Sequence, residues 1–144
     1  MITPDQCLAK YGEPAPAFER KWMAVYGVNG YTSQLHALPR KIYMNKDMWI
    51  PLDEAFRNLI KFGLQDELKT WDGCFNIRPQ RGSSVPSIHS WGVAVDVNAA
   101  WNGLGKVPTL SPLFVRAFKM AGFDWGGDWK GKRIDGMHFQ LQVI

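Results

Sequence analysis

Four side chains in the second half of the chain are of the types that bind and use a divalent metal ion. His89 stands seven residues before Asp96, and Asp135 stands three residues before His138. A catalytic zinc ion commonly takes three ligands from His, Asp, Glu or Cys and keeps a fourth position open. We expect His89, Asp96 and His138 to supply that set. Asp135 is then left beside the metal as a general base on water and a general acid to the leaving amine.

Two alternating segments position these residues. Between Val93 and Asn98 the valines fall on one face, and Asp96 falls on the other with small or polar neighbours. From Met137 to Val143 apolar residues again alternate with polar ones, and His138 is on the polar side. This period of two is typical of strands. If the two strands lie side by side with their apolar faces in the core, the two histidines and two aspartates converge on one polar face.

The loop before His89 offers a cation for an oxyanion that develops during the reaction. Arg78 is the first candidate and Arg81 the alternative, although Arg78 could equally pair with a surface carboxylate. Most of the tryptophans are expected in the core, and a few are expected to wall a groove for an extended substrate. We expect the substrate to be contacted by the side chains Arg81, Ser87, Trp91 and Trp129.

The remaining elements predict an α+β fold in which a small antiparallel sheet packs against about three helices. Residues 1–16 have the Pro and Gly content of an arm or loop. The whole chain is expected to form one domain, with an N-terminal arm and helix in 1–50 and a catalytic core in 70–144. Apolar residues at helical spacing predict a helix at 15–25. Proline in the first turn, together with an apolar stripe or a capping residue, predicts helices at 51–62 and 111–122. Strands are predicted at 41–44, 74–77, 93–98 and 137–143.

Composition narrows the function classes. The chain has 144 residues, 46% hydrophobic residues and a net charge of +4, which are ordinary values for a globular domain. Its basic residues are scattered, which argues against a nucleic-acid partner. No apolar run is long enough for a membrane span, and no leader segment is evident. We therefore expect a protein made in the cytoplasm that acts elsewhere only after release. We also expect a monomer.

The motifs carry a family resemblance. The pattern Ser87-x-His89-x-x-Gly92-x-Ala94-x-Asp96, followed by Trp125-Gly-Gly-Asp-Trp129 and Asp135-x-Met-His138-Phe, resembles the VanY / D-alanyl-D-alanine carboxypeptidase zinc peptidases. That family includes phage endolysins that are L-alanyl-D-glutamate endopeptidases. The matching motifs span about residues 75–140, whereas residues 1–50 match none.

The resemblance has implications for fold, metal and roles. It implies a fold shared with the Hedgehog signalling domain and one Zn²⁺ held by His89, Asp96 and His138. It also implies that Asp135 is the catalytic acid and base, and that Arg78 corresponds to the arginine that holds the scissile carbonyl.

From these observations we expect a zinc-dependent peptidase whose partner is the peptidoglycan stem peptide. L-Ala–D-Glu endopeptidase activity in a phage endolysin is favoured, with action in the host periplasm. D-Ala–D-Ala carboxypeptidase activity is the alternative within the family. Two rivals lie outside it: a glycosidase with Asp96 and Asp135 as its carboxylate pair, and a non-catalytic zinc module that binds the cell wall.

Overall fold

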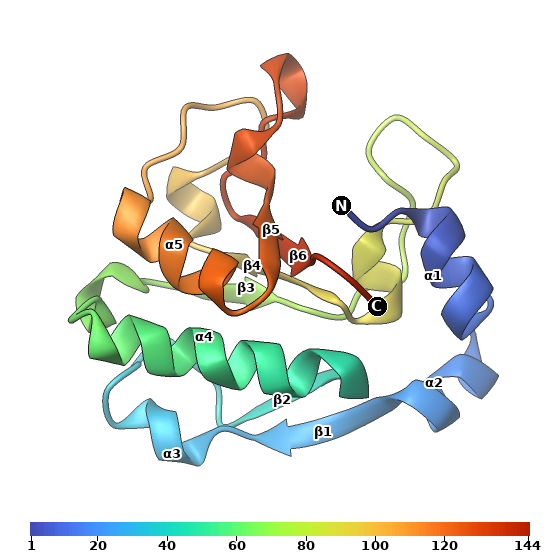
Figure 1. Cartoon of the computed structure of the whole chain (residues 1–144). Coiled ribbons are helices and arrows are strands. Elements are labelled where there is room, and N and C mark those ends of the chain that lie inside the picture. The colour runs from blue at the N-terminus through green and yellow to red at the C-terminus, as the bar shows by residue number, and fades with distance from the viewer.

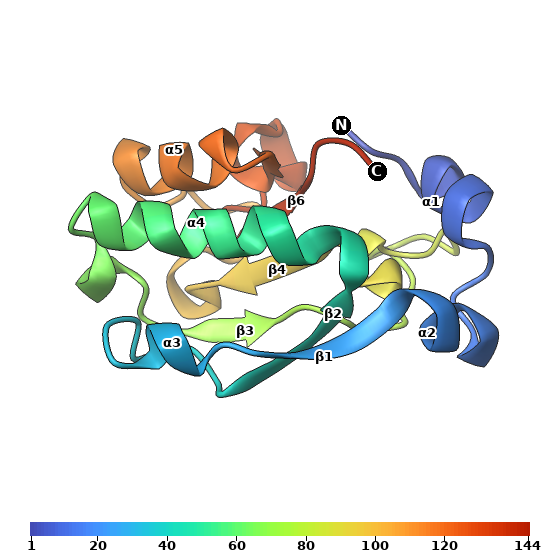
Figure 2. The same ribbon diagram turned by 60° about the horizontal axis from the view of Figure 1, so that its bottom comes forward.

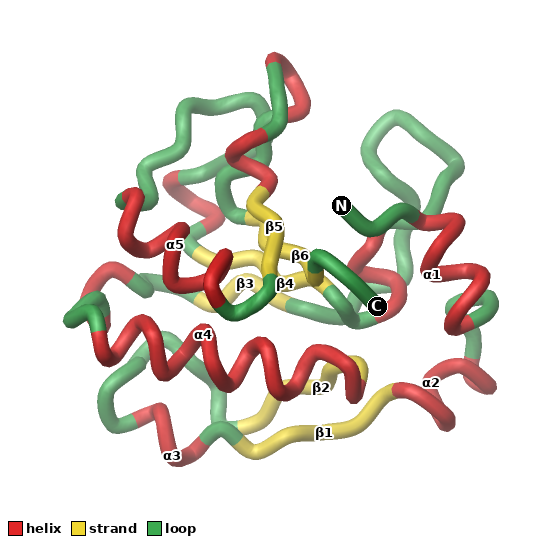
Figure 3. Tube along the Cα trace, in the orientation of Figure 1, coloured by secondary structure: helices red, strands yellow, loops and turns green.

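Two antiparallel sheets and five α-helices form the structure, which is a computed structural model covering residues 1–144 (Figures 1 and 3). The helices are α1 (Pro4–Tyr11), α2 (Pro16–Trp22), α3 (Asn29–Thr32), α4 (Trp49–Lys61) and α5 (Pro112–Met120). The strands are β1 (Met23–Gly27), β2 (Lys41–Asn45), β3 (Trp71–Gly73), β4 (Ala94–Val97), β5 (Phe123–Trp125) and β6 (His138–Leu141). The predicted α+β class with antiparallel pairing is confirmed.

The two strands that were predicted to lie together are neighbours in the larger sheet. β1 and β2 form a separate hairpin, and the other strands form a sheet in the order β3-β4-β6-β5. β6 pairs with β4 so that Ala94 lies opposite Gln140 and Asp96 lies opposite His138. Residues directly opposite one another in antiparallel strands place their side chains on the same face. The register therefore brings Asp96 and His138 together.

Helices α4 and α5 lie side by side over one face of the four-stranded sheet (Figures 1 and 2). Phe118 of α5 stacks on Phe139 of β6 with ring centroids 4.2 Å apart, and Phe56 of α4 meets Trp71 of β3 edge-on. Ser111 begins α5, because its hydroxyl accepts a hydrogen bond from the Phe114 amide, as a good N-cap does. The contact between α5 and Phe139 places one face of β6 in the hydrophobic core. The other face of β6 is then left for its polar residues.

The N-terminal residues form a helix, so the prediction of an arm or loop for residues 1–16 was wrong in this part. Thr3 and Gln6 form a reciprocal capping box at the start of α1, and Pro4 takes the first helical position. This is a complete helix-start signal in a short segment. α1 packs against the 3₁₀ helix Ile88–Trp91, and the Trp91 indole donates a 2.8 Å hydrogen bond to the Gly12 carbonyl.

Two other predicted elements also differ from the structure. The helix predicted for 15–25 ends at Trp22, because the following residues alternate in exposure and pair with β2 over their whole length. The strand predicted for 74–77 is not formed, and β3 ends at Gly73. Beyond Gly73 the chain enters the loop that leads to His89. In this loop the Asn76 amide donates a hydrogen bond to the His89 carbonyl at 3.1 Å. None of the helices is both long enough and apolar enough to cross a membrane.

Candidate functional site

Asp96 and His138 meet on the sheet face opposite α4 and α5. Asp96 Oδ1 lies 3.3 Å from His138 Nδ1, and the two side chains are 18% and 7% exposed. Their chain neighbours Val95 and Phe139 are fully buried in the core. Strand pairing thus brings one carboxylate and one imidazole to the same place, partly shielded from solvent.

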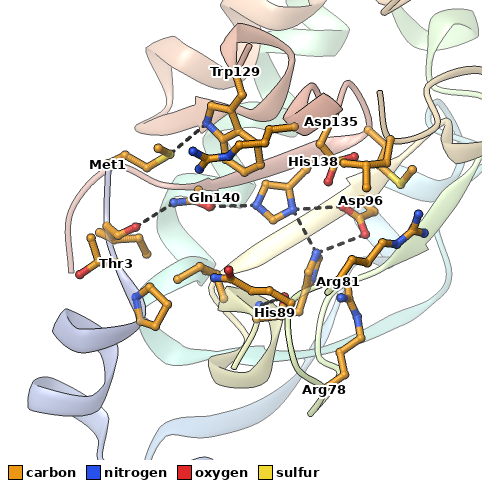
Figure 4. Close-up of a pocket in the computed structure, with 18 of the residues that line it drawn as sticks. Met1, Thr3, Arg78, Arg81, His89, Asp96, Trp129, Asp135, His138 and Gln140 are labelled. Carbon is orange, nitrogen blue, oxygen red and sulfur yellow. Dashed lines mark hydrogen bonds and ion pairs between the residues drawn. The ribbon is translucent and has the colours of Figure 1, made fainter. Parts of the chain in front are cut away.

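His89 reaches the same place from the 3₁₀ helix Ile88–Trp91 and not from a strand. The Ser87 hydroxyl caps this helix by accepting a hydrogen bond from the His89 amide at 3.4 Å. His89 Nε2 lies 3.2 Å from Asp96 Oδ2 and 3.1 Å from His138 Nδ1. One ligand atom from each of the three residues lies within 4.8 Å of the others (Figure 4).

The helix Ile88–Trp91 ends at Gly92 in the left-handed region, with φ of 67°. A Cβ at Gly92 would lie 2.7 Å from Met23 Sδ of the hairpin. The hairpin also holds this helix through Asn45, whose side-chain amide donates to the Trp91 carbonyl at 3.0 Å. The β1–β2 hairpin therefore supports His89, although it contributes no side chain to the site.

In each histidine one ring nitrogen points away from Asp96, and its hydrogen bond shows which ring nitrogen carries the proton. His89 Nδ1 lies 2.7 Å from the Cys74 carbonyl oxygen, and His138 Nε2 lies 3.0 Å from Gln140 Oε1. A carbonyl oxygen only accepts hydrogen bonds, so these outer nitrogens carry the protons. His89 Nε2 and His138 Nδ1 then present lone pairs toward the Asp96 carboxylate. Such a convergence is repulsive without a cation at its centre, and two imidazoles and one carboxylate suit zinc.

The two carboxylates of the site have opposite pKa shifts. Burial raises the pKa of Asp96, but in the absence of a metal, hydrogen bonds and positive charge from His138 and His89 in their protonated forms outweigh it and hold that pKa well below its usual range. Burial also raises the pKa of Asp135, and there it dominates over the nearby positive charges. Asp96 therefore favours the anionic form more strongly than an ordinary carboxyl group, whereas Asp135 takes up a proton more readily. This division matches one ligand and one proton carrier.

The backbone around Asp135 is held by hydrogen bonds to the end of β5 and the loop that follows it. Its amide donates to the Gly126 carbonyl at 2.9 Å, and the Trp125 indole donates to the Gly136 carbonyl at 2.8 Å. Its Oδ1 atom is buried and has no hydrogen-bond partner. The loop thus fixes the Asp135 backbone and leaves a carboxylate oxygen available at the site.

Gly126→Ala is expected to lower turnover on the order of 10²-fold, because a Cβ at this position would collide with the Asp135 carbonyl oxygen. Displacement of a catalytic group by about 1 Å has an effect of this size. The metal content should fall much less than turnover, since the hard collision is with Asp135 and the proposed ligand His138 is met only through its Cβ, at 3.2 Å. Peptidase assays with metal analysis test this. Gly30→Ala is the control, because it introduces a methyl group into open space. Wild-type turnover in folded Gly126→Ala would contradict the proposed support of Asp135.

The cluster lies in a cavity of about 440 Å³. Asp96, Asp135 and both histidines line it, and four basic side chains surround them. In Figure 4, Arg78 and Arg81 lie on one side of the histidines, across from Met1 and Trp129. The basic residues of the lining are Arg78, Arg81, Lys132 and Arg133. The cavity can therefore receive an anionic ligand next to the cluster.

Not every predicted substrate contact lies in this cavity. Arg81, Ser87 and Trp129 line it, but Trp91 is fully buried in the core and bonded to Gly12. A substrate cannot reach Trp91 in this structure, so its predicted contact is replaced by a packing role. Trp91 is the last residue of the 3₁₀ helix that carries His89, and its indole bonds the backbone of Gly12 just after α1.

The two arginines differ in their surroundings. The Arg78 guanidinium bonds the Pro79 carbonyl at 3.4 Å. Burial raises the pKa of Asp135, and the positive charge of Arg81 partly opposes this rise. Both line the cavity, so both are within the site where an oxyanion would develop.

Sequence reasoning assigned no role to several residues of the cavity wall. Gln140 was placed on the polar face of its strand by alternation, which was the available signal for it. Lys132 and Arg133 stood in a loop without a motif, and the segment Met1–Pro4 lies far from the site in sequence. All of these line the cavity. Only the folded chain shows that they belong to it.

Comparison with protein families gives one match. Residues 81–141 match the family described as D-alanyl-D-alanine carboxypeptidase. This segment contains His89, Asp96, Asp135 and His138, and begins after Arg78. No curated protein and no solved structure gives a significant match to the chain. The family resemblance predicted from the motifs is confirmed over this segment, and the match supports a zinc-type metallopeptidase that acts on peptidoglycan.

Proposed function

We propose that one zinc ion is held by His89 Nε2, the Asp96 carboxylate and His138 Nδ1. The observation that carries this proposal is the convergence of these atoms within 4.8 Å, with both outer ring nitrogens bonded to oxygen. When bound, zinc lowers the pKa of water to near 7 and polarises a carbonyl oxygen. We further propose that the whole chain acts as a single monomeric peptidase domain.

In this proposal Asp135 carries the proton. Its buried and unpartnered Oδ1 accepts the proton of the attacking water and then donates it to the nitrogen of the leaving amine. The raised pKa of Asp135, caused by burial, suits a group that must hold the proton between these two events. Arg78 or Arg81 faces the charge that develops on the carbonyl oxygen.

We propose L-Ala–D-Glu endopeptidase activity, with a role as a phage endolysin in host cell lysis. In the stem peptide, the residue after this bond carries a free α-carboxylate and continues through its side chain to further charged residues. The terminal D-Ala of a carboxypeptidase substrate carries a single carboxylate. Four basic side chains around the cavity exceed what one carboxylate needs, and this favours the endopeptidase.

Lys132→Glu combined with Arg133→Glu is expected to raise KM about tenfold at low salt, because both side chains line the cavity and face an anionic substrate. The effect should shrink as salt is added, since screening acts on exposed charges. KM and kcat measured at several ionic strengths test this. The control is Arg40→Glu with Lys41→Glu, an adjacent basic pair outside the cavity with the same change in net charge. Equal KM values in the two double variants would contradict substrate binding by Lys132 and Arg133.

Digestion of purified peptidoglycan tests the proposed bond. The wall is treated with the protein before and after metal removal by a chelator, and again after zinc is restored, and the fragments are analysed by mass. New D-Glu amino termini that appear only with metal support the endopeptidase. Release of free D-Ala alone would assign the carboxypeptidase, and cut glycan strands without metal would assign the carboxylate-pair glycosidase.

The non-catalytic alternative and the endolysin role need separate measurements. A wall-binding zinc module should bind peptidoglycan and release no fragment under any condition. An endolysin should clear cells whose outer membrane has been made permeable, at a rate that falls when zinc is removed. Intact cells under these conditions, together with digestion of purified wall, would contradict the lytic role and leave the peptidase activity in place.

A further inference from the structure

Gln140 connects a proposed zinc ligand to the start of the chain. It lies two residues after His138 on β6 and is 2% exposed. Its Oε1 lies 3.0 Å from His138 Nε2, and its Nε2 donates to the Ile2 carbonyl at 3.2 Å (Figure 4). Each end of the buried amide thus has one partner.

The Ile2 carbonyl determines which way the Gln140 amide faces. A backbone carbonyl only accepts, so the NH₂ group of Gln140 must point to Ile2 and the oxygen must point to His138. His138 must then donate from Nε2, which leaves the lone pair on Nδ1. A flipped amide would present NH₂ to His138 Nε2 and favour the other tautomer, whose Nδ1–H points at the proposed metal position.

The two histidines differ in how they are oriented. His89 bonds the backbone carbonyl of Cys74, which cannot flip. His138 depends on a side-chain amide, and that amide depends on where Ile2 lies. The tautomer of His138 is therefore sensitive to the position of the N-terminal segment, and that of His89 is not.

The segment Met1–Pro4 is itself held against the cavity. The Ile2 side chain is 5% exposed in the core, and Thr3 begins α1 through its capping box with Gln6. The Trp129 indole bonds Met1 Sδ at 3.1 Å. These contacts leave the Ile2 carbonyl little freedom to move away from Gln140.

We propose that Gln140, oriented by the Ile2 carbonyl, is a positioning residue that fixes the metal-binding tautomer of His138, and that Met1–Pro4 is thereby part of the metal centre. The inference rests on the proposed function, in which His138 Nδ1 is a zinc ligand. It extends the centre to residues outside the matched segment 81–141.

Zinc affinity of Gln140→Leu, measured by competition with a chromophoric chelator, tests the inference. Loss of an outer-shell partner lowers metal affinity about 10- to 100-fold, and we expect a loss in this range. Gln140→Glu keeps an acceptor for His138 Nε2 and should restore most of the affinity. The matched control is Gln142→Leu, because Gln142 is the next polar residue of the same alternation and its side-chain amide donates to the Phe123 carbonyl, away from the cluster.

A double-mutant cycle tests the part played by Ile2. Ile2→Ala loosens the segment and should weaken zinc binding several-fold, but it should have no further effect when Gln140 is already Leu. Additive losses would mean that Ile2 acts only through general stability, and this would overturn the proposed link.

Imidazole NMR adds a readout that does not depend on activity. The chain has 3 histidines, so the signals can be assigned, with the exposed His36 as internal reference. His138 should carry its proton on Nε2 in the wild type and lose this preference in Gln140→Leu. If the wild type binds zinc and Gln140→Leu binds it equally well, the inference fails alone. If the wild type does not bind zinc, the proposed function fails.

Discussion

Asp135→Asn is expected to lower turnover by about 10²- to 10⁴-fold, the range that a positioned general acid and base contributes, while zinc stays bound. The amide has nearly the shape of the carboxylate and can still accept a hydrogen bond, but it cannot take and return a proton. Asp135 is not one of the three residues whose ligand atoms converge, so the metal site should be unchanged. Steady-state hydrolysis and metal analysis of the same sample measure both effects.

Asp66→Asn is the control for this variant, because Asp66 is exposed and lies outside the cavity. Near-normal turnover in Asp135→Asn would remove Asp135 from the chemistry. Loss of zinc with loss of turnover would instead make Asp135 a ligand. A protein that keeps zinc, loses turnover and still binds the wall would agree with the proposed enzyme and disagree with a purely structural zinc module.

Asp96→Asn should mainly weaken zinc binding. Loss of an outer-shell partner lowers metal affinity by at most about 100-fold, and loss of a direct ligand should lower it by more than that. Asp96 contributes the negative charge that lies between His89 Nε2 and His138 Nδ1, at 3.2 Å and 3.3 Å. An amide oxygen supplies no such charge to a divalent cation. Chelator competition measures the affinity, and activity in excess zinc shows how much of the loss comes from an empty site.

The two asparagine variants control each other. Each replaces one carboxylate by an amide of the same shape in the same cavity, so differences between them report the role of the group and not the kind of change. If both variants lose zinc equally, the assignment of one ligand and one proton carrier is wrong. If neither loses zinc, the converging atoms are not the metal site.

The sequence predicted the central part of the site because strand periodicity is a local property. Alternation from Val93 to Asn98 and from Met137 to Val143 placed Asp96 and His138 on polar faces, and antiparallel pairing then left few ways to arrange them. The structure confirms this pairing, with Asp96 opposite His138. The metal-ligand chemistry of His and Asp completed the hypothesis.

The parts that were missed depend on contacts between distant segments. The capping box of Thr3 was present in the sequence, but the Pro and Gly around it favoured a loop. Trp91 was assigned to the substrate because it is close to His89 in sequence, yet one turn of 3₁₀ helix sends the two side chains in different directions. The role of Gln140 could not be seen before the position of Ile2 was known, because those residues are 138 positions apart.

The place of β6 in the sheet has a consequence for biosynthesis. This strand is the last of the chain, yet it lies between β4 and β5, which are made before it. Until His138–Leu141 has left the ribosome, the earlier strands lack their central partner and the cluster lacks one of its three residues. Long-range pairing of this kind is slow to form compared with local contacts. If the cluster is the proposed zinc site, a nascent chain cannot complete it before His138–Leu141 has emerged from the ribosome.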